Sequence, residues 1–349
     1  MRLVLAFLIS TGFGSAALGQ AMAVPVLDVH AVPYLDDAGR SAYQRWLDAN
    51  LPRAFAVAPD GNFGAQTGTP YEPLETVRRA AIEKCAVKGA KGCALYAENL
   101  NVVRPSQEAR TAPPPGPLIS GWSYAFVPDE NYIWRGPSQA RGVLIWGHSY
   151  GGPEQDKRGI QPQAHNRPLN NAGYDVVRFD RQAMSDGRDA AAGWLRDGLR
   201  QLRRLGYRSV VVGGESRGAW NSLQVLDTPG LADAVIAVSA AAHGYGGSTN
   251  LMAQTDELRS ILSGVAPGRT RVAFIQFAND LYISDPDRRA ALMQNVAPRL
   301  EALLLIDRPD GLSGHDASGT DAFAERYGDC LKHFIMDVQP PRSCSGKPR

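Results

Sequence analysis

The stretch that decides the fold is Ser209-Val210-Val211-Val212-Gly213-Gly214-Glu215-Ser216-Arg217-Gly218-Ala219-Trp220. A run of β-branched apolar residues enters a G-x-S-x-G motif, and apolar residues then recur at helical spacing: Ala219, Trp220, Leu223 and Leu226. The pattern predicts a strand that turns sharply into a helix and holds the Ser216 hydroxyl at the turn. Gly214 and Gly218 lack side chains, which would let two backbones pass close to this serine.

A second G-x-S-x-G motif, Gly147-His148-Ser149-Tyr150-Gly151, also follows an apolar run. It continues into Gly152-Pro153, a loop composition that cannot start a helix beneath the serine. We therefore interpret Ser216, and not Ser149, as the residue of an exposed strand-to-helix turn. His148 is expected to orient its loop by hydrogen bonding.

Strand-like and helix-like segments alternate in the C-terminal two thirds of the chain. Strands are predicted over residues 123–127, 142–146, 175–179, 210–212, 234–238, 272–277 and 303–306, and a strong helix over residues 190–205. This alternation predicts a mostly parallel sheet with helices on both faces. In such sheets, functional residues lie at the carboxyl ends of the strands.

Residues of about 118–335 resemble the α/β-hydrolase superfamily, through the motif around Ser216, the glycine-rich loop His148-Ser149-Tyr150-Gly151-Gly152 and the strand pattern. The resemblance implies the α/β-hydrolase fold and a nucleophile, acid and histidine in that chain order. It assigns these roles to Ser216, Asp280 and His315. It also implies an oxyanion hole formed by the backbone N–H groups of Tyr150 and Arg217.

The chemistry explains why three residues are needed. A serine hydroxyl is a poor nucleophile at neutral pH, so an imidazole must take its proton, and a carboxylate fixes the imidazole tautomer. Asp285 and Asp287 are alternatives to Asp280, and any of the three can instead cap a helix. His333 also lies beyond the acid strand, but in a helical stretch beside Cys330, which favours His315.

Four residues are candidates for the substrate pocket: His148, Ser149, Trp220 and His243. Trp146 and Trp220 would either form an apolar wall for the substrate or pack in the core. Residues 251–262 would form either a helical lid or an ordinary surface helix. Glu215 and Arg217 flank the serine with charge, and the sequence does not decide whether they pair or whether Arg217 meets an anionic substrate.

The N-terminus reads as a signal peptide over residues 1–23, with Arg2, a short apolar core and small residues before Gly19 or Ala23. It predicts a periplasmic or secreted protein, and no later stretch is long enough to span a membrane. The spacing of the four cysteines favours the local pairs Cys85–Cys93 and Cys330–Cys344, with two other connectivities open.

The chain is expected to have two folded parts. Residues 24–103 form a small α+β module of order α-β-β-α-β, with its last strand over residues 93–103. A Pro-rich linker over residues 104–118 leads to the catalytic domain, residues 119–349.

The net charge of +2 over 349 residues gives no electrostatic case for nucleic acid. No spacing typical of a metal site occurs, and no cofactor is expected. The sequence therefore predicts an exported serine hydrolase that cleaves an ester, lactone or amide, from a small or polymeric substrate, through an acyl-enzyme. Two alternatives stay open: a serine peptidase, and a non-catalytic binding protein on a hydrolase fold. The sequence makes no prediction of the oligomeric state.

Overall fold

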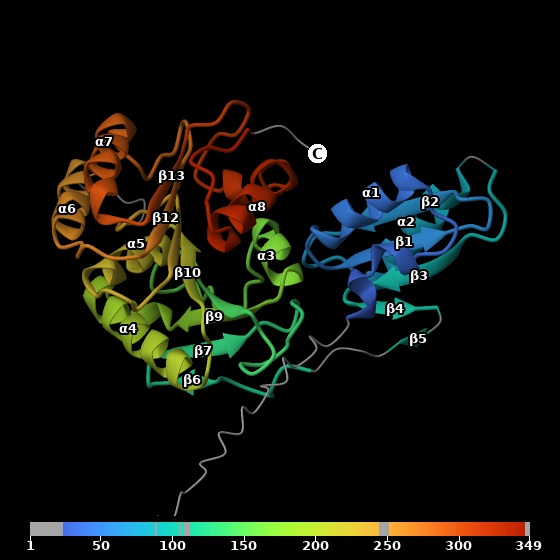
Figure 1. Cartoon of the computed structure of the whole chain (residues 1–349), viewed down its shortest axis with the longest axis horizontal. Helices are drawn as coiled ribbons and strands as arrows, with labels where there is room; N and C mark the ends of the chain where they lie inside the picture. Colours follow the sequence, from blue (N-terminus) through green and yellow to red (C-terminus); the bar gives the residue numbers. More distant parts are fainter. Residues whose placement is uncertain (1–23, 88, 105, 108–111, 244–250, 346–349) are drawn as a thin grey trace, which may run out of the picture.

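The computed structural model describes residues 24–87, 89–104, 106–107, 112–243 and 251–345. The predicted signal peptide lies outside these residues, as does part of the predicted linker. The chain forms a five-stranded sheet in its N-terminal part and an eight-stranded sheet in the remainder (Figure 1). Within the described residues, none of the helices combines the length and the apolar character that crossing a membrane requires.

The larger sheet is mostly parallel, as the alternation of segments predicts. Its strands are β6 (Ile119–Ser120), β7 (Tyr124–Pro128), β8 (Gly142–Gly147), β9 (Tyr174–Arg181), β10 (Val210–Glu215), β11 (Ala234–Val238), β12 (Arg271–Gln276) and β13 (Ala302–Asp307). They lie in the order β13-β12-β11-β10-β8-β9-β7-β6. The six strands from β13 to β9 pair in parallel. At one edge β7 pairs antiparallel with β9, and β6 pairs antiparallel with β7.

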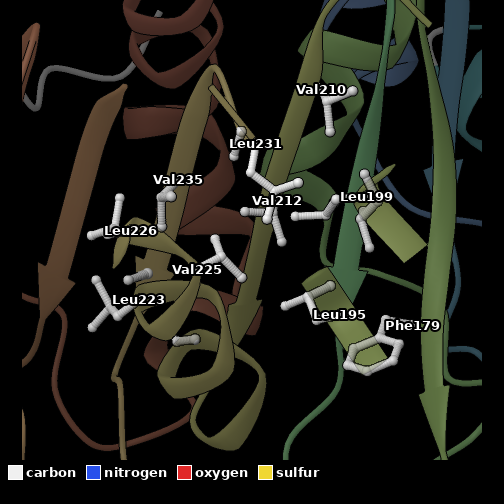
Figure 2. Packing of buried hydrophobic residues seen from close by; sticks show 14 of the residues in the cluster. Phe179, Leu195, Leu199, Val210, Val212, Leu223, Val225, Leu226, Leu231 and Val235 are labelled. Carbon is white, nitrogen blue, oxygen red and sulfur yellow. The ribbon is translucent and has the colours of Figure 1, made fainter. Parts of the chain in front are cut away.

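Helices cover both faces of this sheet (Figure 1). One face carries α4 (Arg188–Arg204), α5 (Arg217–Gln224), α6 (Leu251–Ser263) and α7 (Pro286–Val296), and the other carries α3 (Arg167–Asn171) and α8 (Asp321–Met336). Side chains along each strand alternate between two apolar clusters, as in β8, where Val143 and Ile145 join one cluster and Leu144 joins the other. Figure 2 shows part of the first cluster, with Leu199 of α4 beside Val212 of β10 and Leu223 of α5 farther along the same face.

The helix predicted over residues 251–262 is α6, and it is not a lid. Leu258 and Leu262 are buried in the apolar cluster on the sheet, which fixes α6 as a helix of the domain surface. Burying a leucine stabilises a fold by about 1.5–3 kcal/mol, so lifting α6 away would be costly. Residues 244–250, which precede α6, lie outside the described residues.

The N-terminal module follows the predicted order, with more strands. It contains α1 (Asp37–Leu47), β1 (Arg53–Val57), β2 (Phe63–Thr67), α2 (Leu74–Ala86), β3 (Ala94–Glu98), β4 (Asn101–Val103) and β5 (Ser106–Gln107), in the antiparallel order β2-β1-β3-β4-β5. The single strand predicted over residues 93–103 is a hairpin, because Asn99 adopts a φ of 48°. β5 lies inside the predicted linker, so the first linker residues belong to the sheet.

Short 3₁₀ helices complete the fold: η1 (Pro25–Leu27), η2 (Val29–Ala31), η3 (Ala164–Asn166), η4 (Ala183–Ser185), η5 (Val225–Asp227), η6 (Ala297–Arg299) and η7 (Ala317–Gly319). Two disulfides, Cys85–Cys93 and Cys330–Cys344, join the cysteines in the pairs that their spacing favours. The first closes the end of α2 onto the start of β3, and the second ties the chain after α8 back to that helix.

Polar contacts join the N-terminal module to the part of the chain that carries the larger sheet. Leu51 and Gln161 exchange two hydrogen bonds: the Leu51 N–H donates to Gln161 Oε1 at 3.1 Å, and Gln161 Nε2 donates to the Leu51 carbonyl at 3.3 Å. The buried Arg167 donates to Gln161 Oε1 at 2.7 Å and to Asn50 Oδ1 at 3.2 Å, and lies over the Tyr132 ring. A buried charge needs such hydrogen bonds, so these contacts fix the module against the domain.

We predict that Gln161→Ala lowers the free energy of unfolding by about 1–3 kcal/mol, because the Leu51 N–H and the Arg167 guanidinium both lose an acceptor. Urea denaturation followed by circular dichroism measures the change. Gln139→Ala is the matched control, since Gln139 is exposed and should change stability by less than about 0.5 kcal/mol. Equal midpoints for the two variants would show that the contact contributes nothing.

Candidate active site

Ser216 lies at the turn between β10 and α5, with φ 55° and ψ −114°. A non-glycine residue rarely adopts a positive φ, and the surrounding structure must enforce it. The Ser216 N–H donates to the carbonyl of Val238 at 2.9 Å, which ties the turn to β11. A side chain at Gly214 or Gly218 would collide with the backbone of Gly147 on β8, so both positions require glycine.

His315 and Asp280 are hydrogen-bonded to each other. His315 Nδ1 lies 2.8 Å from both carboxylate oxygens of Asp280, and the Tyr282 N–H donates to the same carboxylate at 2.9 Å. The side chains are 12% and 1% exposed, so the pair is shielded from solvent. The loops that carry them, after β13 and after β12, are joined by a hydrogen bond from the Gly314 N–H to the Ala278 carbonyl.

The two alternative acids have other partners. Asp285 caps α7, with its carboxylate accepting from the Arg288 N–H at 3.4 Å. Asp287 pairs with Arg308, and its side chain is 82% exposed. Neither contacts a histidine within the described residues. Of the three carboxylates, the geometry therefore favours Asp280 as the partner of His315.

Ser216 and His315 line one cavity of about 520 Å³, together with Tyr150 and Arg217. Arg217 is the first residue of α5, so its backbone N–H is among those that a helix leaves without an intrahelical acceptor. Two of the predicted pocket residues, Ser149 and His243, also line this cavity. The remaining lining residues are Gly151, Gly152, Gln155, Lys157, Ala241, Tyr282 and Asp316.

The tryptophans do not form the predicted wall of the pocket. Trp220 is 1% exposed, because it lies on the face of α5 that packs into the core beside the sheet. Trp146 packs in the cluster on the opposite face of the sheet. The aromatic lining of the cavity comes from Tyr150 and Tyr282, and the Tyr282 ring lies 4.4 Å from that of His315. No motif marks Tyr282, so the sequence does not show that it lines the cavity beside His315.

His148 does not line the cavity either. Its ring is hydrogen-bonded to the backbone of the glycine-rich loop, which lines the cavity. Its Nε2 accepts from the Arg181 N–H at 3.0 Å, and its Nδ1 donates to the Ser149 carbonyl at 2.6 Å. Burial and the nearby Arg181 charge lower the pKa of His148 to about 3, so the ring is neutral. Both ring nitrogens are thus used, and the expected orienting role fits this geometry.

Glu215, immediately before Ser216, is buried beside the histidine. Its carboxylate accepts a hydrogen bond from the Gln163 side chain. Burial raises the pKa of Glu215 to about 7, the charges of Asp316 and Asp280 act in the same direction, and His315 opposes them. The sequence reveals the charge of Glu215, but Gln163 lies 52 residues away and carries no signal.

The surroundings of His315 favour its charged form. Burial lowers the pKa of His315, but the hydrogen bond and charge of Asp280, with the charges of Glu215 and Asp316, outweigh this effect and raise the pKa above its usual 6.5. Within the described residues, no three His, Cys, Asp or Glu side chains converge in the way that metal ligands do.

The structure combines three features. It has a strand-to-helix turn at Ser216, a mostly parallel eight-stranded sheet, and a hydrogen-bonded acid and histidine in the loops after β12 and β13. The domain has the α/β-hydrolase fold. Its glycine-rich loop after β8 lies beside the Ser216 turn, as that fold requires.

Comparisons with solved structures find esterases. The chain is similar to esterase Pf2001 of Pyrococcus furiosus, with 14% identity, a TM-score of 0.41 and coverage of 64% of this chain and 97% of the other. Est1E of Butyrivibrio proteoclasticus has 11% identity and a TM-score of 0.43, with 62% and 98% covered. Brefeldin A esterase, a bacterial homologue of human hormone-sensitive lipase, has 16% identity and a TM-score of 0.39, with 58% and 70% covered.

No sequence-family profile matches the chain, and no curated protein matches it either. Likenesses at these identities and TM-scores carry no conclusion about chemistry. The function must therefore be argued from the site itself.

We predict that Glu215→Gln becomes more stable relative to the native chain as the pH rises from 5 to 8.5. A carboxyl whose folded pKa is near 7, against about 4.5 when unfolded, loses folding free energy as the pH rises through that window. Glutamine cannot ionise, so the variant avoids a loss on the order of 3 kcal/mol. Urea unfolding of both proteins at the two pH values measures it. A stability difference that does not change with pH would contradict the assignment.

Proposed function

We propose that this chain is a serine hydrolase, acting on a carboxylic ester, lactone or amide, with Ser216 as nucleophile, His315 as general base and Asp280 as its partner. The observation that carries the proposal is that the strained Ser216 and His315, which is hydrogen-bonded to Asp280, line one cavity. Perturbed titratable groups beside a nucleophile in a cavity are typical of catalytic sites.

In this mechanism the Nδ1–H of His315 donates to Asp280, which leaves Nε2 as the acceptor for the Ser216 proton. The serine oxygen attacks the carbonyl carbon of the substrate as that proton moves to His315. The imidazolium so formed is stabilised by Asp280, and it returns the proton to the leaving group as the acyl-enzyme forms. Water then attacks the acyl-enzyme by the same route and releases the acid.

The negative charge that develops on the carbonyl oxygen needs donors already in position. The backbone N–H groups of Arg217, at the start of α5, and of Tyr150, in the glycine-rich loop, are the proposed donors. Removing one such donor in other enzymes costs roughly 10²–10³ in rate. The hydrogen bonds of His148 fix the backbone of the loop that carries Tyr150, which supports this role.

One assay separates an esterase from a peptidase. A panel of acyl 4-nitrophenyl esters, run beside aminoacyl and peptidyl 4-nitroanilides, ranks the two by kcat/KM. The non-catalytic alternative predicts turnover of none of them and no labelling by a fluorophosphonate. The hydrogen-bonded Asp280–His315 pair beside Ser216 argues against that alternative.

We also propose that the protein is exported to the periplasm or secreted, with residues 1–23 as its signal peptide. The two disulfides support this, because disulfides persist in oxidising compartments. A separate module over residues 24–103 and the boundary at residues 104–118 likewise remain proposals.

We predict that Ser216→Ala abolishes fluorophosphonate labelling and lowers kcat/KM by on the order of 10⁴–10⁶, with the fold intact. Ser149→Ala is the matched control, since Ser149 occupies the other G-x-S-x-G motif and lines the same cavity. It should keep labelling and substantial activity. Labelling that survives in Ser216→Ala and disappears in Ser149→Ala would reverse the assignment.

The acid is tested by Asp280→Asn, Asp285→Asn and Asp287→Asn measured side by side. Asp280→Asn should lower kcat on the order of 10⁴, because the imidazole loses its orienting partner, whereas the other two replace a helix cap and an exposed ion pair.

The native kcat/KM should fall on the acid side with an apparent pKa above 6.5, since the pKa of His315 is raised and the base must be neutral. Native rates in Asp280→Asn, or an acid limb well below pH 6, would refute the assignment.

A further inference from the structure

The side chain of Arg217 is a buried cation without a carboxylate partner among the described residues. It is 7% exposed, and its Nη1 donates to the backbone carbonyl of Asp186 at 2.9 Å. Its Nε has no acceptor. The carboxylate of Asp186 is already paired with Arg181 at 3.0 Å. Two buried arginines, Arg181 and Arg217, therefore share the single buried carboxylate of Asp186, and buried charges in proteins are nearly always balanced by a partner.

Two further cations lie near Arg217: Arg181, which pairs with Asp186, and Arg188, which pairs with Glu257. Burial lowers the pKa of Arg217, Asp186 partly offsets this, and the charges of Arg181 and Arg188 lower the pKa further. Lys157 lines the cavity with Arg217 and has no ion-pair partner in the part of the chain that the structure describes. The acidic side chain of the lining, Asp316, directly follows His315 in the chain.

We propose that the cavity binds substrates that carry a carboxylate or a similar anionic group, held by the side chains of Arg217 and Lys157 while the reacting carbonyl faces Ser216. The proposal rests on the proposed hydrolase function, because it concerns the same cavity. A guanidinium suits this task, since its planar donors match a carboxylate and its charge persists at any working pH. Arg217 would act twice, through its backbone at the oxyanion and through its side chain at the distal anion.

Matched ester pairs test the preference. On the acyl side, 4-nitrophenyl hydrogen glutarate is compared with its methyl ester, and on the alcohol side 4-butyryloxybenzoate with its methyl ester. Within each pair the methyl ester removes the negative charge and adds one methyl group. The expected result is a kcat/KM at least tenfold higher for the charged member of one pair, with an advantage that shrinks as salt rises. Equal values in both pairs would overturn the proposal.

Variants then locate the preference. Arg217→Met should reduce the ratio of charged to neutral kcat/KM by at least tenfold, whatever its effect on the rate with the neutral ester. Lys157→Met should reduce the ratio several-fold. Arg158→Met is the matched control, because Arg158 is the next residue along the loop, pairs with Asp156 and does not line the cavity. A ratio that falls equally in Arg158→Met would mean that general charge, and not this subsite, is responsible.

Binding separates this proposal from the hydrolase itself. Glutarate is titrated calorimetrically into Ser216→Ala and into Ser216→Ala combined with Arg217→Met, both beside glutaramide. If the native protein hydrolyses none of the esters, and glutarate binding to Ser216→Ala is nevertheless lost when Arg217→Met is added, the result would support the anion subsite and refute the hydrolase. Hydrolysis of both members of each pair at equal rates, without glutarate binding, would refute the subsite and leave the hydrolase standing.

Discussion

The close contact of three backbones beneath Ser216 is the constraint on which the rest of the site depends. Gly147 at the end of β8, Gly214 on β10 and Gly218 on α5 meet where no Cβ fits. This contact lets α5 start directly after the strand and keeps the serine at a positive φ. It also brings the loop after β8 next to the turn, so that the fold delivers Tyr150 and Ser216 to one cavity. A side chain at any of the three positions would disturb both.

The order of the strands in the sheet brings Asp280 and His315 to the same cavity. β11, β12 and β13 lie in succession beside β10, so the loops after β12 and β13 end at the same edge as Ser216. The position of His315 is then fixed by a hydrogen bond between those two loops and by one from the Ser239 hydroxyl to the His315 carbonyl. The position of the proposed nucleophile depends on a local strain, and the position of the proposed acid–base pair depends on the order of the strands.

Much of this was predictable from sequence because it is local or periodic. The motif at Ser216 and the strand pattern follow from spacing along the chain, and the resemblance to the α/β-hydrolase superfamily implies the positions of Asp280 and His315. What failed depends on contacts between distant segments. The orientation of Trp220 depends on which side of α5 packs on the sheet. The sequence does not distinguish a lid from a surface helix for α6, because an amphipathic pattern does not show which surface its apolar side contacts. The partner of Glu215, Gln163, could not be found because no local rule links residues so far apart.

The turn at Ser216 also divides the charges of the site. Glu215 faces His315 and Asp316 on one side, whereas Arg217 lies near Arg181 and Arg188 on the other. On the proposed mechanism a positive charge forms on the histidine while a negative charge forms on the carbonyl oxygen. The acidic side stabilises the first charge and the basic side the second, and both sets of groups are in place before substrate arrives. On the proposed mechanism, the sharp turn at Ser216 therefore places two residues that are close in the sequence, Glu215 and Arg217, beside the two opposite charges that form in the reaction.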